Sequence, residues 1–162
     1  FAPAERAGFG VDTHAFGAGD HITLCGVKIP SAHGLIAHSD GDAAVHALMD
    51  ALLSAAGLRD IGFYFPESDE RFAGADSMAL LAEVIGMLRT QGLAVRNASV
   101  SVVAERPRLF PYIEEMKQNL ADVLGISVSC VGVAAGTNEK LGYVGEGKGI
   151  TCFATVLLRK GT

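Results

Sequence analysis

The feature that most constrains the fold is an apolar helical stretch that follows a polar loop. Residues 37–41 read Ala-His-Ser-Asp-Gly, and apolar residues then recur at helical spacing over about residues 42–56. Ser39 or Asp40 is expected to cap this helix, because a side-chain oxygen there can accept from unpaired backbone N–H groups, and Gly57 suits the left-handed position after its end. The stripe predicted to face the core comprises Val45, Leu48, Met49, Leu52, Leu53 and Ala56.

The opposite flank of this helix is polar. Asp42, His46, Asp50 and Ser54 follow one another at four-residue spacing, so His46 lies between two carboxylates. Two interpretations are open: a solvated helix face with an ordinary histidine, or a face that contributes a ligand to a site. The helix taken alone favours the first.

The size and composition of the chain predict one globular domain. Its 162 residues are 49% hydrophobic and 19% charged, which is sufficient for a core. We expect a single domain over residues 7–162 and set residues 1–6 aside as a trimmed or added terminal segment. His46 and Asp50 interrupt the longest apolar run, so no stretch reaches the roughly 18 residues of a membrane span. A membrane is therefore not an expected partner.

Cysteine content and charge bound the location and the partners. Cys25, Cys130 and Cys152 are odd in number, lie in strand-like apolar segments and have no C-x-x-C spacing. They are expected to be reduced, which predicts a cytoplasmic protein. The formal charge of −5 and the lack of a Lys/Arg run argue against nucleic acid as the main partner. An anionic small substrate remains compatible if metal ions supply positive charge.

The remaining chain alternates strand-like and helix-like patterns around one long loop over residues 58–75. Because the helices are grouped rather than strictly alternating with strands, we expect a two-layer α+β sandwich, with helices on one face of a mixed or mainly antiparallel sheet. The expected strands are 7–14, 22–24 paired with 27–29 in a hairpin, 93–105, 128–135 and 150–158, and the further helices run from Asp76 or Ser77 to Gly92 and from Pro111 to Leu124.

One candidate metal site combines the first strand with the first helix. Strand alternation makes Asp12 and His14 project side by side, away from Phe9 and Val11. With His46 they form a set of two histidines and one carboxylate. Three protein ligands leave a coordination position open, as in catalytic zinc sites, and the same set could hold non-haem iron. Only a fold that joins the strand to the helix would form this site.

Two further segments carry candidate chemistry. His38 stands at the helix entrance, where exposed N–H groups favour an anion such as a substrate phosphate, although a simple cap would look the same. Residues 137–140, Thr-Asn-Glu-Lys, offer Glu139 to a hard cation such as magnesium, or form a solvated loop. The segment 142–149 nearly matches a phosphate-binding P-loop but is rejected, because Gly149 replaces the Ser/Thr and a strand follows instead of a helix.

Several separated segments, in order and at compatible spacing, resemble the 2-C-methyl-D-erythritol 2,4-cyclodiphosphate synthase family. The resemblance covers essentially the whole chain after Arg6. The segments that carry it are 10–14 (Gly-Val-Asp-Thr-His), 37–42 (Ala-His-Ser-Asp-Gly-Asp) through 46–48, 60–62 (Asp-Ile-Gly), 65–66 (Phe-Pro), 74–77 (Gly-Ala-Asp-Ser), 106–109 (Arg-Pro-Arg-Leu) and 137–142 (Thr-Asn-Glu-Lys-Leu-Gly).

The resemblance implies an enzyme of non-mevalonate isoprenoid biosynthesis. Such an enzyme converts 4-diphosphocytidyl-2-C-methyl-D-erythritol 2-phosphate to the 2,4-cyclodiphosphate and releases CMP, by intramolecular attack of the 2-phosphate on the β-phosphorus. The resemblance also implies a homotrimer with each active site between adjacent subunits. Two alternatives are a zinc-dependent phosphate-ester hydrolase, which would need a nearby general base, and a trimeric nucleotide-binding module without catalysis.

The resemblance also implies roles for individual residues. Zinc would be held by Asp12, His14 and His46, and magnesium or manganese by Glu139 with substrate phosphates. The family's transition-state stabilisers and substrate contacts are implied at further positions. The stabilisers would be His38 and Thr137, and the substrate contacts Ser39, Asp60, Ile61, Gly62, Phe65, Pro66, Glu67, Ser68, Asp69, Ala104, Glu105, Arg106, Pro107, Arg108, Leu109, Phe110, Ala135, Gly136, Asn138, Tyr143 and Glu146.

Overall fold

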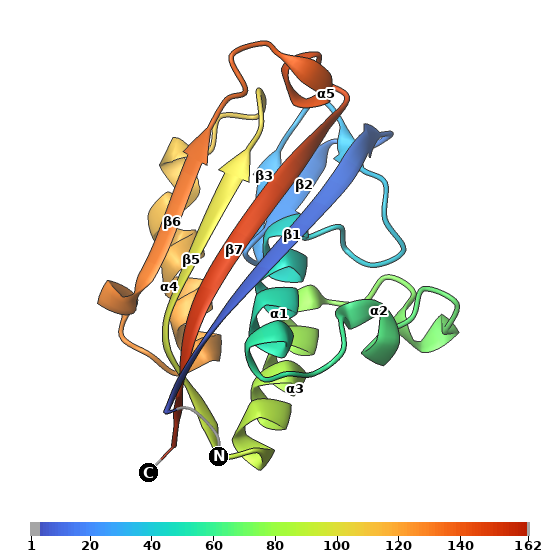
Figure 1. The fold of residues 1–162 in the computed structure, drawn as a ribbon. Coiled ribbons are helices and arrows are strands. Elements are labelled where there is room, and N and C mark those ends of the chain that lie inside the picture. The colour runs from blue at the N-terminus through green and yellow to red at the C-terminus, as the bar shows by residue number, and fades with distance from the viewer. Residues whose placement is uncertain (1–3, 162) are drawn as a thin grey trace.

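The computed structural model describes residues 4–161 and contains a five-stranded mixed sheet (Figure 1). Residues 1–3 of the terminal segment set aside above lie outside the described residues. Neighbouring strands are antiparallel except β5 and β6, which are parallel. In spatial order the strands are β4 (Gly34–Leu35), β1 (Glu5–Gly17), β7 (Gly149–Lys160), β5 (Leu93–Val103) and β6 (Val131–Gly136).

Three long helices cover one face of this sheet (Figure 1), which confirms the expected two-layer α+β arrangement. They are α1 (Ala43–Ala55), α3 (Ser77–Thr90) and α4 (Ile113–Leu124). Among the described residues, no helix has both the length and the apolar character required to cross a membrane. The smaller elements are the hairpin β2 (His21–Leu24) and β3 (Val27–Pro30), the short helices α2 (Ile61–Tyr64) and α5 (Gly142–Gly145), and the 3-10 turns η1 (Glu70–Phe72), η2 (Phe110–Tyr112) and η3 (Val128–Cys130).

Several element ends differ from the sequence prediction for local reasons. The α1 cap is Asp42 rather than Ser39 or Asp40, because its side chain accepts from the backbone N–H of Val45. Strand β1 begins at Glu5, so two residues of the segment set aside above pair with β7. Residues 128–130 form the turn η3, capped by Ser127, so β6 begins three residues later than predicted.

The packing of α1 on β1 depends on two glycines that face the helix. A Cβ atom at Gly10 would lie 2.0 Å from the carbonyl oxygen of Ala47, and one at Gly8 would lie 2.0 Å from that of Ala51. No side chain other than hydrogen can therefore occupy these positions while the helix keeps this distance from the strand. The strand and the helix meet backbone to backbone.

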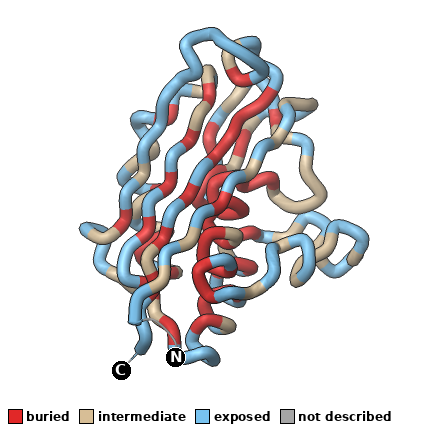
Figure 2. Tube along the Cα trace, viewed as in Figure 1, coloured by how far each residue is buried: buried red, intermediate tan, exposed pale blue. Residues whose placement is uncertain are grey.

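The helix α1 is buried on nearly all sides (Figure 2). Leu48, Leu52 and Leu53 are fully buried, and each contributes roughly 1.5–3 kcal/mol of hydrophobic stabilisation relative to an exposed position. The predicted polar flank is buried at its N-terminal end as well, since Asp42 is 0% and His46 is 9% exposed. The interpretation of this flank as a solvated face is therefore wrong for its first half.

The sheet face opposite the helices carries exposed apolar side chains. Strand β1 alternates as predicted, with Phe9 and Val11 outward and Asp12 and His14 toward the helix layer. Phe9, Val11 and Phe153 are 55%, 47% and 38% exposed, and the Phe9 and Phe153 rings are 6.2 Å apart. This face is apolar enough to pack against another protein surface.

The glycine contact can be tested with a matched pair of alanine substitutions. Gly10→Ala is expected to lower the free energy of unfolding by about 3 kcal/mol, because the methyl group overlaps the α1 backbone. Gly86→Ala is the control: Gly86 lies exposed in α3 with no neighbouring atom within 4 Å of an added Cβ. It should raise stability by up to about 1 kcal/mol. Urea denaturation of both variants checks this, and equal effects would contradict the packing account.

Candidate metal centre

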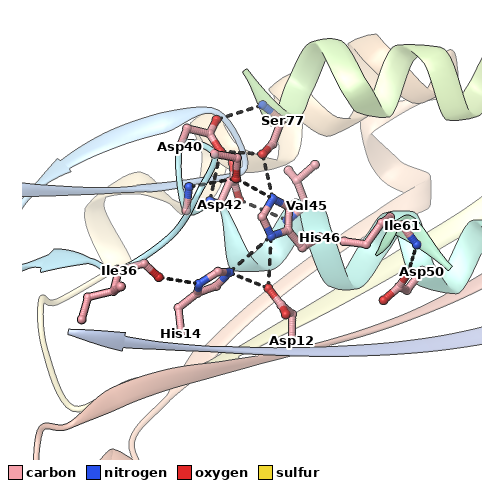
Figure 3. Close-up of polar contacts among 12 residues, drawn as sticks. Asp12, His14, Ile36, Asp40, Asp42, Val45, His46, Asp50, Ile61 and Ser77 are labelled. Carbon is pink, nitrogen blue, oxygen red and sulfur yellow. Dashed lines mark hydrogen bonds and ion pairs between the residues drawn. The ribbon is translucent and has the colours of Figure 1, made fainter. Parts of the chain in front are cut away.

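Three ligand-type side chains meet between β1 and α1 (Figure 3). Asp12 Oδ2 lies 2.8 Å from His14 Nε2 and 3.2 Å from His46 Nδ1, and the two histidine nitrogens are 3.3 Å apart. A tetrahedral ion with bonds of about 2 Å would place its ligands about 3.3 Å apart. The residues therefore fit a metal ion, with the predicted set and with one coordination position left open.

The electrostatics of this cluster favour a charged carboxylate. Burial raises the pKa of Asp12, but hydrogen bonds and charge interactions with His14 and His46 outweigh it and hold the pKa at about 2. The hydrogen bond to Asp12 raises the pKa of His14 above its ordinary value, against the effect of burial. A carboxylate ionised at all ordinary pH values is a suitable anionic ligand for a cation.

Each histidine uses its second ring nitrogen for a hydrogen bond (Figure 3). His14 Nδ1 lies 3.0 Å from the carbonyl oxygen of Ile36, so the neutral ring keeps its proton on this nitrogen and has its lone pair on Nε2. His46 Nε2 lies 2.9 Å from Ser77 Oγ, at the start of α3. Such outer contacts orient metal-ligating histidines. The sequence patterns did not predict Ile36 and Ser77 as partners of the histidines, because both contacts join distant segments.

Asp42 fixes the N-terminus of α1, and with it the position of His46. Its carboxylate accepts from the backbone N–H groups of Val45, Cys25 and Gly26 at 2.8–3.1 Å, which ties the β2–β3 turn to the helix. Burial raises the pKa of Asp42 to about 6, against the effect of these three donors. Asp42, which helical spacing placed on the polar flank of the helix, thus holds the β2–β3 turn and α1 together.

A cavity of about 140 Å³ opens beside the three ligands. Asp50, further along the polar flank of α1, accepts from the N–H of Ile61 at 2.9 Å and so holds α2 at its edge. Four of the predicted substrate contacts in residues 60–69 line the same cavity as the cluster. Predicted site residues that line this cavity are Asp12, His14, His38, Ser39, His46, Ile61, Gly62, Phe65 and Glu67.

A second, open groove of about 1590 Å³ runs along the ends of β5 and β6 and reaches Phe16 near the end of β1. Glu105 Oε1 accepts from the N–H groups of Asn138 and Lys140 at 2.9 and 3.1 Å. This carboxylate therefore holds the loop in which Glu139 and Lys140 adopt positive φ angles of 54° and 63°. Predicted site residues that line the groove are residues 104–110, Ala135, Gly136, Thr137 and Glu146.

The predicted residues thus form two groups within one chain, and among the described residues none lines both the cavity and the groove. His38 and Thr137, predicted to act together, belong to different groups. Asp69 binds the Arg71 guanidinium at 2.6 Å, and Tyr143 hydrogen-bonds Thr151. The predicted residues that line neither pocket are Asp60, Pro66, Ser68, Asp69, Asn138, Glu139 and Tyr143.

These features define an α+β protein in which two residues of β1 and one residue of the first turns of α1 form a cluster that could hold a metal ion. A model of the YgbB family matches residues 5–159, and the chain belongs to this family.

Curated relatives and solved structures agree with this assignment. The 2-C-methyl-D-erythritol 2,4-cyclodiphosphate synthase of Acinetobacter baylyi is 52% identical over 153 residues, 94% of each chain. The bifunctional IspDF of Campylobacter jejuni superposes with a TM-score of 0.92 at 38% identity, covering 96% of this chain and 42% of that longer one. The IspF of Plasmodium falciparum, solved as a CDP complex, has a TM-score of 0.87 at 32% identity and full coverage of both chains.

Metal binding at this cluster should weaken in acid. A proton and a metal compete for Nε2 of His14, whose pKa is raised above its ordinary value, whereas Asp12 with a pKa of about 2 stays ionised. Affinity for Zn²⁺ should therefore fall by at least about tenfold per pH unit once the pH drops below the pKa of His14. Calorimetric titrations from about pH 8 to about pH 5.5 measure this.

The control is His21→Ala, which removes an exposed histidine that pairs with Asp20 at 2.7 Å, away from the cluster. Its pH profile should match that of the unchanged protein. An affinity independent of pH over this range would contradict ligation by His14.

Proposed function

We propose that this chain catalyses the cyclodiphosphate synthase reaction. The substrate is 4-diphosphocytidyl-2-C-methyl-D-erythritol 2-phosphate, and the products are 2-C-methyl-D-erythritol 2,4-cyclodiphosphate and CMP. The observation that carries this function is the Asp12, His14 and His46 cluster beside a cavity, in a chain that matches synthases of this name over nearly its whole length. The CDP complex of a structural relative supports a cytidine diphosphate ligand.

The reaction requires no protein nucleophile. An oxygen of the 2-phosphate forms a bond to the β-phosphorus, and the bond from that phosphorus to the bridging oxygen breaks. CMP leaves with the bridging oxygen and its electron pair. The chain's contribution is therefore to hold the two phosphates in line and to stabilise the negative charge that spreads over their oxygens.

The metals proposed are zinc at the cluster and magnesium or manganese at Glu139. A zinc ion would supply Lewis-acid stabilisation of a phosphate oxygen at its open position, and because the reaction is not a redox one, zinc is preferred to iron. Glu139 is exposed and lies in the chain between Thr137 and Lys140, which line the groove, so it is accessible as a magnesium ligand shared with substrate phosphates would be.

The remaining roles follow the two pockets. His38 at the cavity and Thr137 at the groove are the proposed transition-state stabilisers, and the Ser39 hydroxyl is proposed to bind a phosphate. The proposed substrate contacts that line the cavity are Ile61, Gly62, Phe65 and Glu67, and those that line the groove are residues 104–110, Ala135, Gly136 and Glu146. The further proposed contacts, at neighbouring positions of the chain that line neither pocket, are Asp60, Pro66, Ser68, Asp69, Asn138 and Tyr143.

The division of the site supports a homotrimer with active sites between subunits. The cavity and the groove of one chain share no lining residue among those described, yet the reaction needs both. A ring of subunits brings the cavity of one chain to the groove of the next. The outer sheet face, with Phe9 and Phe153 exposed, offers an apolar surface for such an assembly.

We also propose that nucleic acid is not a partner and that the protein is cytoplasmic. A formal charge of −5 argues against nucleic acid as a partner. The thiols of Cys25, Cys130 and Cys152 are unpaired, which supports a reducing, cytoplasmic location.

The His46→Ala variant tests the proposed function most simply. It should fold, lose about nine-tenths of its bound zinc and lower CMP release by about two orders of magnitude or more, because one of three ligands is gone. Metal analysis, circular dichroism and a CMP assay measure the three effects, with His21→Ala as the matched histidine control. A variant with full zinc and full activity would refute the assignment.

Subunit mixing tests the division of the site. His46→Ala and Glu139→Ala chains are each expected to be inactive, since each damages one half. If each site takes one half from each of two neighbouring chains, random assembly after co-refolding equal amounts of the two variants makes about a quarter of all sites intact. CMP release from the mixture measures this recovery. If both halves of a site came from one chain, the mixture would stay as inactive as its components.

A further inference from the structure

A chain of hydrogen bonds runs from His46 into the protein, on the side away from Asp12 (Figure 3). His46 Nε2 lies 2.9 Å from Ser77 Oγ, and Ser77 Oγ lies 2.5 Å from Asp40 Oδ1. The second carboxylate oxygen of Asp40 accepts from the backbone N–H of Ser77 at 2.9 Å. The reaction described above uses neither Asp40 nor Ser77.

The direction of each hydrogen bond in this chain follows from donor chemistry. An ionised carboxylate only accepts, so the Ser77 hydroxyl donates to Asp40. The oxygen of that hydroxyl is then left to accept, and the Nε2–H group of His46 is the donor that faces it. An imidazole with its proton on Nε2 has its lone pair on Nδ1, which is the nitrogen that faces Asp12 and His14.

Burial strengthens the hydrogen bonds of this chain. Ser77 is 0% exposed, so its hydroxyl cannot turn toward solvent, and His46 is 9% exposed. Ser39 Oγ is a second hydroxyl near Nε2, but it lies further away, at 3.2 Å. The Ser77 hydroxyl has a carboxylate to orient it, which makes it the stronger acceptor for His46.

We propose that Asp40 and Ser77 are positioning residues of the metal centre. Asp40 orients the Ser77 hydroxyl, and the hydroxyl holds His46 in the ring orientation and the tautomer that can ligate through Nδ1. This inference rests on the proposed function only in that the cluster binds a metal. Because the Ser77 hydroxyl is the acceptor for His46, the Ser39 hydroxyl remains available to a substrate phosphate.

The decisive variant is Ser77→Ala, which removes the hydroxyl and keeps the backbone N–H to Asp40. Loss of an outer hydrogen bond to a metal-ligating histidine weakens metal affinity by about 10- to 100-fold, so the Zn²⁺ dissociation constant should rise by that factor. Ser54→Ala, at an exposed position on α1, is the matched control and should bind zinc unchanged. Competition with a chromophoric chelator measures the dissociation constants, and thermal melting checks the fold.

The second variant, Asp40→Asn, tests whether Asp40 acts through Ser77. Asparagine keeps an acceptor for the backbone N–H of Ser77, but its amide group no longer draws the hydroxyl proton. Zinc affinity should fall in this variant too, and combining it with Ser77→Ala should add less than twofold to the effect of Ser77→Ala alone. If the double variant lost zinc affinity by the product of the two single losses, Asp40 would act independently of Ser77, and this part of the proposal would be overturned.

A spectroscopic readout separates positioning from general structural damage. In the zinc-loaded protein labelled with ¹⁵N-histidine, the Nε2–H proton of His46 should be visible and protected from exchange, because it donates to a buried hydroxyl. In Ser77→Ala the same proton should exchange at least tenfold faster, while that of His14 on Nδ1, held by Ile36, should not change.

The possible outcomes separate a failure of the positioning role from a failure of the proposed function. If the unchanged protein binds no zinc at the cluster, the metal centre of the proposed function fails. If it binds zinc and folded Ser77→Ala binds zinc equally well with the His46 proton still protected, the positioning role is overturned and the proposed function stands.

Discussion

The contact between α1 and β1 across Gly8 and Gly10 is the constraint on which the site depends. A Cβ atom at Gly10 would come within 2.0 Å of the α1 backbone, so the strand can approach the helix this closely only without side chains there. The residues that follow Gly10 on the same face are Asp12 and His14, and the helix presents His46 to them at 3.2–3.3 Å. A wider gap would separate the ligands by more than a metal can bridge.

Around this contact, charged and polar groups fix the direction of each ligand, and Asp42 and Ser77 among them are fully buried. Asp42 ties the start of α1 to the β2–β3 turn, and the Ile36 carbonyl and the Ser77 hydroxyl each hold one histidine. Buried polar groups of this kind are stable only when their partners are complete. The hydrogen bonds around the three ligand-type residues are satisfied in this way, and the cavity lies beside them.

Local patterns predicted much of this arrangement. Two-residue alternation placed Asp12 and His14 on one face of β1, and helical spacing with Gly57 and Gly125 fixed the ends of α1 and α4, where both glycines adopt φ near 70°. Contacts between distant segments could not be derived in this way. Asp40 reaches Ser77 across 37 residues, and no periodicity shows that the cavity and the groove lie apart. The polar flank of α1 was ambiguous because burial depends on the elements packed around it.

The proposed reaction closes a cyclic diphosphate with the help of a bound metal. The most direct test is phosphorus NMR of the products formed from 4-diphosphocytidyl-2-C-methyl-D-erythritol 2-phosphate and magnesium, with and without a zinc chelator. We expect equal amounts of CMP and the cyclic diphosphate, with both lost on chelation. CMP together with an uncyclised bisphosphate, or no turnover by the zinc-loaded protein, would contradict it.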